Sequence, residues 1–217
     1  MHILIINPNT NPLTTRRIAD VASSVAMPTT KIEVISAQSG IMAIENPKQS
    51  TIAAPIVVRL IAEQAEYYDV TIIAAFSDPG LFKAREITTK PVIGIAESAM
   101  LKAAEFGPKF SIITLGKKFR DLIKNHAEAC GIGNSLANIR FLPWSVSEVG
   151  ANQGQYLEAF RLECERAIEE DGAKAIIIGG GPLSGMAVNI VDELSVPVLD
   201  GVACATQRAE NIVIANN

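Results

Sequence analysis

The feature of this sequence that most restricts its fold is an internal repeat. Residues 69–100 read DVTIIAAFSDPGLFKAREITTKPVIGIAESAM, and residues 174–206 read KAIIIGGGPLSGMAVNIVDELSVPVLDGVACAT. Each segment predicts an apolar strand, a turn rich in Gly, Pro and Ser, a short helix, a Pro-Val strand and a helix start made of small residues. The preceding parts also correspond, because residues 3–9 resemble residues 110–116. We therefore predict two homologous halves.

The strand signals in both halves are short apolar runs, rich in β-branched residues and without polar alternation. Such runs are typical of parallel strands that are buried on both faces. Helical patterns separate them, most clearly over residues 51–68 and 155–170, and this alternation predicts a doubly wound α/β fold. The expected strands are residues 3–6, 31–36, 70–75, 91–95, 110–114, 139–142, 173–178 and 197–199.

The repeat predicts two pseudo-symmetric lobes, each with a mainly parallel sheet flanked by helices. We expect residues 1–100 together with 201–217 to form the first lobe, and residues 101–200 to form the second. The last helix, after Asp200, then packs back on the first lobe. Ligands of open α/β sheets bind beyond the carboxyl ends of the strands, so we expect the active site between the lobes.

Four strand-end loops should meet in that cleft, namely residues 7–10, 75–81, 114–117 and 179–185, with residues 39–47 as a covering lid. Their amides, hydroxyls and backbone N–H groups suit a small ligand that is anionic or bears an amide, although helix capping and turn formation explain the same residue types. Ser77 and Asp78 are expected to cap the helix that begins at Leu81. The substrate-binding candidates are Asn7, Asn9, Thr10, Ser77, Asp78, Thr114, Gly180 and Gly181.

Composition restricts the partners and the location of the protein. The chain has 217 residues, of which 48% are hydrophobic, and a net charge of -4. Without a basic block or a long apolar run, we expect neither a nucleic-acid nor a membrane partner. The glycine-rich loop lacks nucleotide-binding patterns, and no residue cluster suits a metal, so we expect a small-molecule substrate, no cofactor and no metal. Scattered cysteines and a start without signal-peptide features predict a cytoplasmic protein, and we expect a homo-oligomer.

Five motifs carry a resemblance to a known family. They are INPNT at residues 6–10, FSDPGL at 76–81 with ARE at 84–86, PVIGIAESA at 91–99, FSIIT at 110–114 and PVLDG at 197–201. Together they resemble the aspartate/glutamate/hydantoin racemase superfamily, nearest to its hydantoin and allantoin racemase branch. The resemblance runs along nearly the whole chain. It implies a cofactor-independent enzyme that acts on a compact carboxylate, amino-acid derivative or cyclic amide.

The resemblance also implies a mechanism that uses two cysteines, one on each side of the substrate carbon. One thiolate removes the α-proton, and the opposite thiol returns a proton. The matching positions here are Ala75 and Gly180, which cannot transfer protons, and we expect their Cα atoms roughly 7–10 Å apart across the cleft. Ser77 and Ser184 are weak catalytic candidates, because a serine needs an adjacent base. Three lysines could serve as that base, although surface charge explains them better. They are Lys83, Lys117 and Lys118.

The cysteines that the chain does contain do not replace that pair. Cys130, Cys164 and Cys204 are each best explained as small buried hydrophobic residues. The catalytic residues are therefore unknown from the sequence, and natural divergence explains the change around Gly180 better than engineering. The leading hypothesis is an enzyme of this superfamily. The alternatives are a divergent lyase, decarboxylase or hydrolase, and a ligand binder without catalysis.

Overall fold

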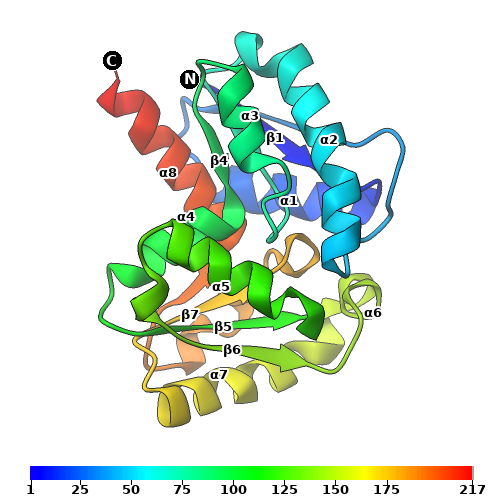
Figure 1. The fold of residues 1–217 in the computed structure, drawn as a ribbon. Coiled ribbons are helices and arrows are strands. Elements are labelled where there is room, and N and C mark those ends of the chain that lie inside the picture. Colours follow the sequence, from blue (N-terminus) through cyan, green and yellow to red (C-terminus); the bar gives the residue numbers. More distant parts are fainter. Residues whose placement is uncertain (217) are drawn as a thin grey trace.

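Two four-stranded parallel sheets, each flanked by helices, form the molecule (Figure 1). The computed structural model describes residues 1–216. The first sheet has the order β2-β1-β3-β4, and the second has the matching order β6-β5-β7-β8. All neighbouring strands of these residues run parallel, so the predicted fold class is confirmed. The strands are β1 (His2–Asn7), β2 (Lys31–Ser36), β3 (Val70–Ile73), β4 (Val92–Gly94), β5 (Phe110–Leu115), β6 (Leu136–Leu142), β7 (Ala175–Gly179) and β8 (Val198–Asp200).

Helices follow the strands in a similar order in both halves, with one difference. They are α1 (Pro12–Val25), α2 (Pro47–Gln64), α3 (Leu81–Ile87), α4 (Ile95–Ala104), α5 (Arg120–Ala129), α6 (Val146–Ala151), α7 (Leu157–Asp171) and α8 (Gly201–Ala215). Where the first half has α3, the second half has three short 3-10 turns, at Gly181–Leu183, Ala187–Asn189 and Val191–Glu193. The short helix predicted there is wrong, because Pro182 and Gly185, with φ 88°, interrupt a helical run.

The central strands are apolar because both of their faces are covered. Every residue of β3, β5 and β7 is buried, whereas the edge strand β2 leaves Lys31 and Glu33 exposed. This is the burial that the continuous apolar runs predict. The helix predicted over residues 51–68 begins earlier, at Pro47, because the side chain of Asn46 caps it.

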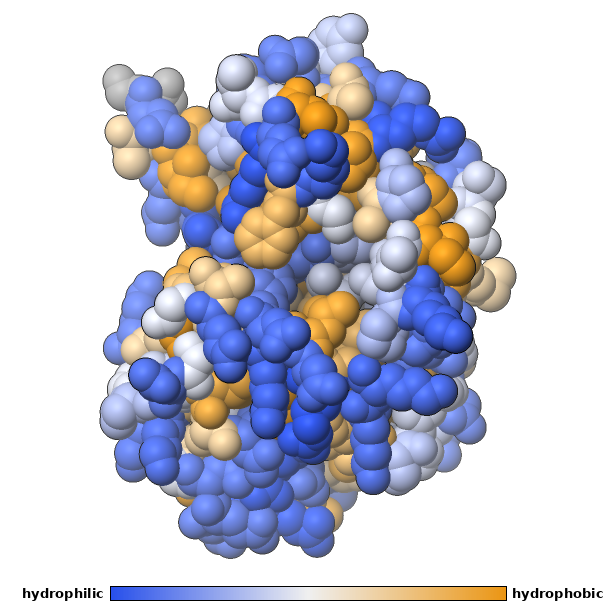
Figure 2. All heavy atoms as spheres, viewed as in Figure 1, coloured by the Kyte–Doolittle hydropathy of each residue, from blue (hydrophilic) through white to orange (hydrophobic). Residues whose placement is uncertain are grey.

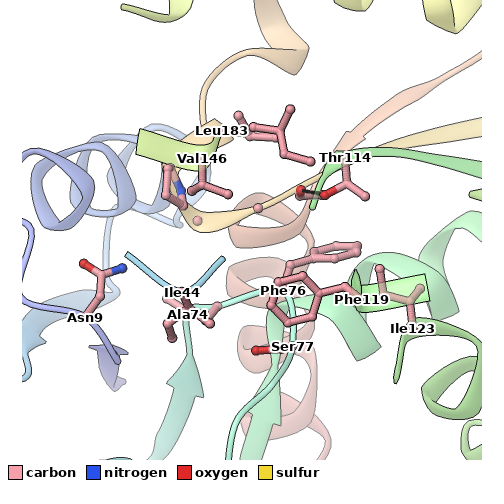
Figure 3. Close-up of a pocket in the computed structure, with 16 residues that line it drawn as sticks. Asn9, Ile44, Ala74, Phe76, Ser77, Thr114, Phe119, Ile123, Val146 and Leu183 are labelled. Carbon is pink, nitrogen blue, oxygen red and sulfur yellow. Dashed lines mark hydrogen bonds between the residues drawn. The ribbon is translucent and has the colours of Figure 1, made fainter. Parts of the chain in front are cut away.

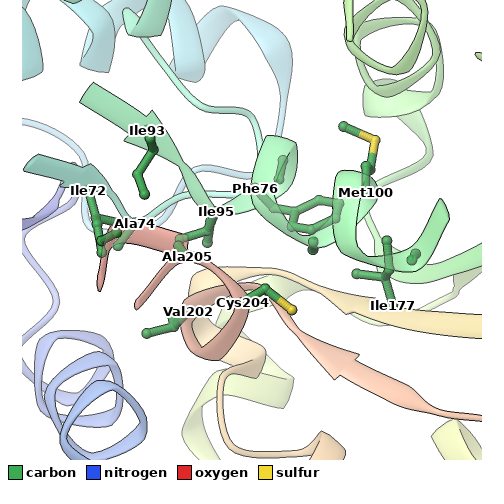
Figure 4. Close-up of a cluster of buried hydrophobic side chains, with 14 of the residues drawn as sticks. Ile72, Ala74, Phe76, Ile93, Ile95, Met100, Ile177, Val202, Cys204 and Ala205 are labelled. Atoms are coloured by element: carbon green, nitrogen blue, oxygen red, sulfur yellow. The ribbon is translucent and has the colours of Figure 1, made fainter. Parts of the chain in front are cut away.

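The helices α4 and α8 pack against each other, and each contacts the sheet of the other half. α4 follows the last strand of the first sheet but contacts β7, and α8 ends the second half but contacts α1 and β3. The apolar core is therefore continuous between the sheets, and Ile72, Met100, Ile177 and Val202 belong to one cluster (Figure 4). The contacts of α8 agree with a first lobe of residues 1–100 and 201–217, a division that we retain as a proposal.

Candidate functional site

A small cavity lies between the two sheets, at the carboxyl ends of their strands (Figure 3). Its volume is about 50 Å³. All four loops that the sequence brings to this point contribute to its wall, through Asn9, Ala75, Thr114 and Gly180. Ile44 also lines the cavity and comes from residues 39–47, which we call the lid segment. The two halves thus share one site.

The glycine-rich loop after β7 lies so close to the loop after β3 that side chains would not fit between them. A Cβ atom on Gly181 would lie 2.9 Å from the carbonyl oxygen of Ala74. A Cβ atom on Gly179 would lie 2.6 Å from the ring of Phe76. Gly180 has φ 151°, which L side chains rarely adopt. Glycine is therefore required here for the two halves to meet.

Asn9 presents a fixed hydrogen-bond donor to the cavity. Its side-chain oxygen accepts the Nδ2 group of Asn7 at 3.1 Å and the backbone N–H of Asn11 at 2.9 Å. Because both bonds engage the oxygen, the amide nitrogen is left facing the cavity (Figure 3). This nitrogen suits a ligand carbonyl or carboxylate oxygen.

Two hydroxyl groups line the cavity from opposite halves. The Thr114 hydroxyl donates to the carbonyl oxygen of Gly179 at 2.6 Å, which uses its proton to hold the glycine-rich loop. The Ser77 hydroxyl lies 2.8 Å from the hydroxyl of Ser50, which comes from α2. When Ser50 donates in this pair, the proton of Ser77 is free to bind a ligand oxygen.

Four residues to which the sequence points do not line this cavity, namely Asn7, Thr10, Asp78 and Ser184. Asn7 is fully buried and fixes the side chain of Asn9. The backbone N–H of Thr10 donates to the lid segment, and Ser184 closes the turn after β7 through its own backbone N–H. These residues support the wall of the cavity.

Asp78 caps α4 and not the helix that follows it, so the prediction that Ser77 and Asp78 cap α3 is wrong. The Asp78 carboxylate accepts the backbone N–H groups of Ala96 and Glu97, at 3.1 and 2.9 Å. α3 begins after Gly80 without any side-chain cap. The left-handed φ of 39° at Asp78 turns its carboxylate toward Gly94, where a Cβ atom would clash with it.

Ionisable groups gather behind the cavity but do not enter it. Burial raises the pKa of Asp78 to about 7, although hydrogen bonds from the start of α4 oppose this. Nε2 of His126 lies 3.6 Å from an Asp78 oxygen, and this nitrogen has no hydrogen-bond partner among residues 1–216. Burial lowers the pKa of His126. Burial alone would raise the pKa of Glu97, but hydrogen bonds from Arg85 and Arg208 lower it. No ionisable side chain of the described residues lines the cavity.

Sequence comparison places this architecture in a known group. The profile of the Asp/Glu/Hydantoin racemase family matches residues 3–209, which include both halves and every loop around the cavity. The chain belongs to the Asp/Glu/Hydantoin racemase family. The resemblance carried by the five sequence motifs is therefore confirmed.

Individual members of the racemase family match along almost the whole chain. A hydantoin racemase from Pseudomonas sp. (strain NS671) is 36% identical over 214 residues, which cover 98% of this chain and 86% of that protein. The allantoin racemase from Klebsiella pneumoniae is 35% identical with a TM-score of 0.95, and the match covers 100% of this chain and 89% of that one. The allantoin racemase from Pseudomonas fluorescens is 30% identical with a TM-score of 0.94, and the match covers 100% of this chain and 92% of that one.

No cysteine of residues 1–216 lines the cavity. Ala75 and Gly180 both line the cavity, and they come from opposite halves. Burial raises the pKa of Cys130 to about 11, and the pKa values of Cys164 and Cys204 to about 12. All three thiols therefore stay protonated near neutral pH.

Several cavity residues of this racemase-family chain were not identified from the sequence. Phe119 and Ile123 lie four residues apart on the buried side at the start of α5, so the helical spacing of apolar residues was an available signal. Ser50, which contacts the cavity residue Ser77 without lining the cavity itself, gives no such signal, because one serine near a helix start is ordinarily explained by capping. Within residues 1–216, no group of three or more His, Cys, Asp or Glu side chains could hold a metal.

Proposed function

We propose that this racemase-family chain is a cofactor-independent enzyme that acts on a compact carboxylate, amino-acid derivative or cyclic amide between its two sheets. The observation that supports this is the cavity, where loops of both halves bring together Asn9, Ser77, Gly180 and Gly181. Hydantoin and allantoin, from which the similar racemases take their names, are compact cyclic amides. They present the carbonyl oxygens that such a lining can bind.

The chemistry that this lining supports is stabilisation of negative charge on a substrate oxygen. Nδ2 of Asn9 and the hydroxyl of Ser77 are donors that the fold holds in place before the ligand arrives. Fixed donors in a site from which water is excluded stabilise an oxyanion more strongly than water does. A carbonyl next to the reacting carbon would therefore be activated without a charged side chain.

Ala75 and Gly180 favour a second candidate function, which is a reaction without two-sided proton transfer. Racemisation needs an acid–base group on each face of the carbon. A lyase, decarboxylase or hydrolase needs the same oxygen donors but not that pair. A protein that binds its ligand without catalysis needs the donors alone.

Racemisation is tested with allantoin and a 5-substituted hydantoin in deuterated water. We expect the purified protein to add nothing to the spontaneous loss of optical rotation or to the exchange of the α-proton, because no thiol or other strong base lines the cavity. Polarimetry and proton NMR give the two rates, and samples without protein give the background. Robust turnover would show that another acid–base pair operates in the cavity.

The enzyme and the binder are separated by a panel of compact carboxylates and cyclic amides. Proton NMR follows product formation, and saturation-transfer NMR follows binding in the same samples. Turnover of any member, reduced in Asn9→Ala, supports an enzyme. Saturable binding without turnover across the panel supports the binder, and the absence of both contradicts the proposed site.

Other expectations about partners extend the proposal. No helix of residues 1–216 is long and apolar enough to cross a bilayer. A cytoplasmic location, a homo-oligomeric state and the lack of a nucleic-acid partner remain predictions. Gel filtration with light scattering measures the oligomeric state directly.

A further inference from the structure

The cavity is too small to hold the substrates proposed for it. Its volume of about 50 Å³ leaves room for no more than a few water molecules. Sites for drug-sized ligands usually measure about 300–1,000 Å³. Even a compact cyclic amide therefore needs the wall of the cavity to move before it can enter. The part of the wall that moves most easily determines where the ligand enters.

A much larger hollow lies directly outside one part of that wall. It has a volume of about 680 Å³ and lies between α2, α3 and α5. We call it the outer groove and define it by Ser50, Ser77, Phe82, Leu122, Asn125 and His126. Figure 2 shows this face of the molecule hollowed between its two lobes.

The cavity and the outer groove share parts of their walls. Ser77 lines both of them. The segment that forms α5 also separates them, because Phe119 and Ile123 line the cavity, whereas Leu122 and Asn125 line the groove. The two spaces are therefore neighbours on either side of a single layer of side chains.

The two spaces adjoin at a pair of hydroxyl groups from Ser50 and Ser77. Their oxygens lie 2.8 Å apart, Ser50 lines the groove and Ser77 lines both spaces. One hydrogen bond of this kind contributes about 1 kcal/mol net. Both side chains are small, and their rotation requires no movement of the backbone.

The opposite wall of the cavity resists opening more strongly. There, the backbone of Gly181 lies against the carbonyl oxygen of Ala74, and Gly179 lies against the ring of Phe76, so the two loops pack without a layer of side chains between their backbones. Opening on that side requires the two sheets to separate. The continuous apolar core between the sheets opposes this movement.

The lid segment is the competing route. It is held to the second half by Glu45, whose carboxylate accepts the backbone N–H and the hydroxyl of Ser147 at 3.2 and 2.9 Å. Glu45 is partly exposed and Ser147 is exposed, so water competes for these hydrogen bonds and they hold the lid segment only weakly. The test must therefore distinguish the lid from the groove.

We propose that the outer groove is the access route by which compact ligands reach the cavity, and that the Ser50–Ser77 hydroxyl pair is the partition that opens. The inference rests on the proposed function in taking the cavity as the reaction site. The groove is lined by two lysines, Lys83 and Lys118, and by two aspartates, Asp78 and Asp121, so charged groups of both signs face it.

The test introduces a thiol into the cavity and measures how fast it is alkylated. Ala75→Cys is made in a Cys130→Ser background, because Cys130 is the half-buried native thiol, whereas Cys164 and Cys204 are buried. The neutral probe is iodoacetamide, and rates are compared at equal thiolate fraction. No substrate is needed, so the result is independent of whether the protein is an enzyme or a binder.

Matched variants on one helix block the groove or leave it open. Asn125→Trp obstructs it, and Lys124→Trp is the control, because Lys124 is also exposed on α5 but lines a different hollow. Asn125→Trp should slow alkylation by on the order of tenfold, and Lys124→Trp should not. Ser50→Ala should accelerate it, and Glu45→Ala, which loosens the lid, should leave it unchanged.

Three results would overturn the inference. One is an equal rate in Asn125→Trp and Lys124→Trp, and another is acceleration by Glu45→Ala without acceleration by Ser50→Ala. The third is a thiol that does not react in the folded protein. Circular dichroism checks that each variant is folded, and Ala129→Trp, at another exposed groove residue, replaces Asn125→Trp if that variant is not.

Discussion

At the scale of single residues, the amide of Asn9 is the donor whose direction is best determined. Asn9→Ala should weaken binding of allantoin or another bound member of the ligand panel by about 1–3 kcal/mol, because a ligand oxygen loses its buried partner. NMR titration measures the change. The control is Gln38→Ala, which removes an exposed amide outside the cavity. Equal affinity in wild type and Asn9→Ala would place the ligand elsewhere.

Asp78 should make the stability of the protein depend on pH in a defined direction. Its pKa is raised to about 7 in the folded state, against about 4 in an unfolded chain, so the folded state binds the extra proton between these values. The stabilisation from Asp78 is complete below about pH 4 and is lost as the pH rises through about 7. Asp78→Asn should therefore destabilise the protein more at pH 5 than at pH 8, as measured by urea unfolding.

The comparison between wild type and Asp78→Asn is needed because His126 acts in the opposite sense. Burial lowers the pKa of His126, so its contribution to stability is lost as the pH falls. The difference between the two proteins removes the part of the His126 contribution that does not depend on Asp78, which lies 3.6 Å away. An equal difference in unfolding free energy at both pH values would contradict a raised pKa for Asp78.

Local sequence patterns identified the cavity loops but not the direction of every side chain in them. Asn9, Ser77 and Thr114 follow apolar strands, and the carboxyl ends of parallel strands converge, so their approach was predictable. The carboxylate of Asp78 caps a helix 18 residues further along the chain, which depends on a left-handed turn and on Gly94. Tertiary contacts of this kind leave no local signal.

At the scale of whole elements, α8 is held to the first half by a buried carboxylate. Glu210 accepts the backbone N–H of Met27 at 2.8 Å and the hydroxyl of Thr30 at 2.6 Å, in the turn before β2. Glu210→Ala should lower the free energy of unfolding by about 1 kcal/mol, because these partly buried donors lose their acceptor. Urea unfolding measures the change.

Two further variants show whether this loss reflects the contact of α8 with the first half. Glu210→Gln keeps an acceptor oxygen and should retain much of the stability. Gln207→Ala changes an exposed side chain on the same helix and should have little effect. A loss in Gln207→Ala as large as that in Glu210→Ala would attribute the effect to helix propensity.

The order of elements was predictable from the sequence because burial on both faces leaves continuous apolar runs in the central strands. The exception is the segment between β7 and β8, where the repeat predicts a helix and the chain forms 3-10 turns. Its backbone N–H group at Gly185 binds the Asp200 carboxylate at 2.8 Å, in place of a helical partner. The sequence repeat therefore predicted the position of the segment but not its conformation.

At the scale of the whole molecule, the shared core predicts unfolding in one step. Trp144 is the single tryptophan and lies in the second half, where its ring packs 4.8 Å from that of Tyr156. Its fluorescence reports on that half, whereas far-ultraviolet circular dichroism reports on both. The two urea transitions should coincide, because one apolar cluster joins both sheets. Separate midpoints would show that the halves unfold independently.

The exchange of α4 and α8 between the sheets has a consequence for how such a chain could have arisen. Each half sends its final helix to the sheet of the other, which is the arrangement of a domain-swapped dimer closed within one polypeptide. Two copies of an ancestral half-length chain would have met in the same way, with one cleft on their twofold axis and identical residues on its two sides. After a gene duplication the two sides of the cleft would be free to diverge, so that Ala75 and Gly180, which line the cavity from opposite halves, need not match.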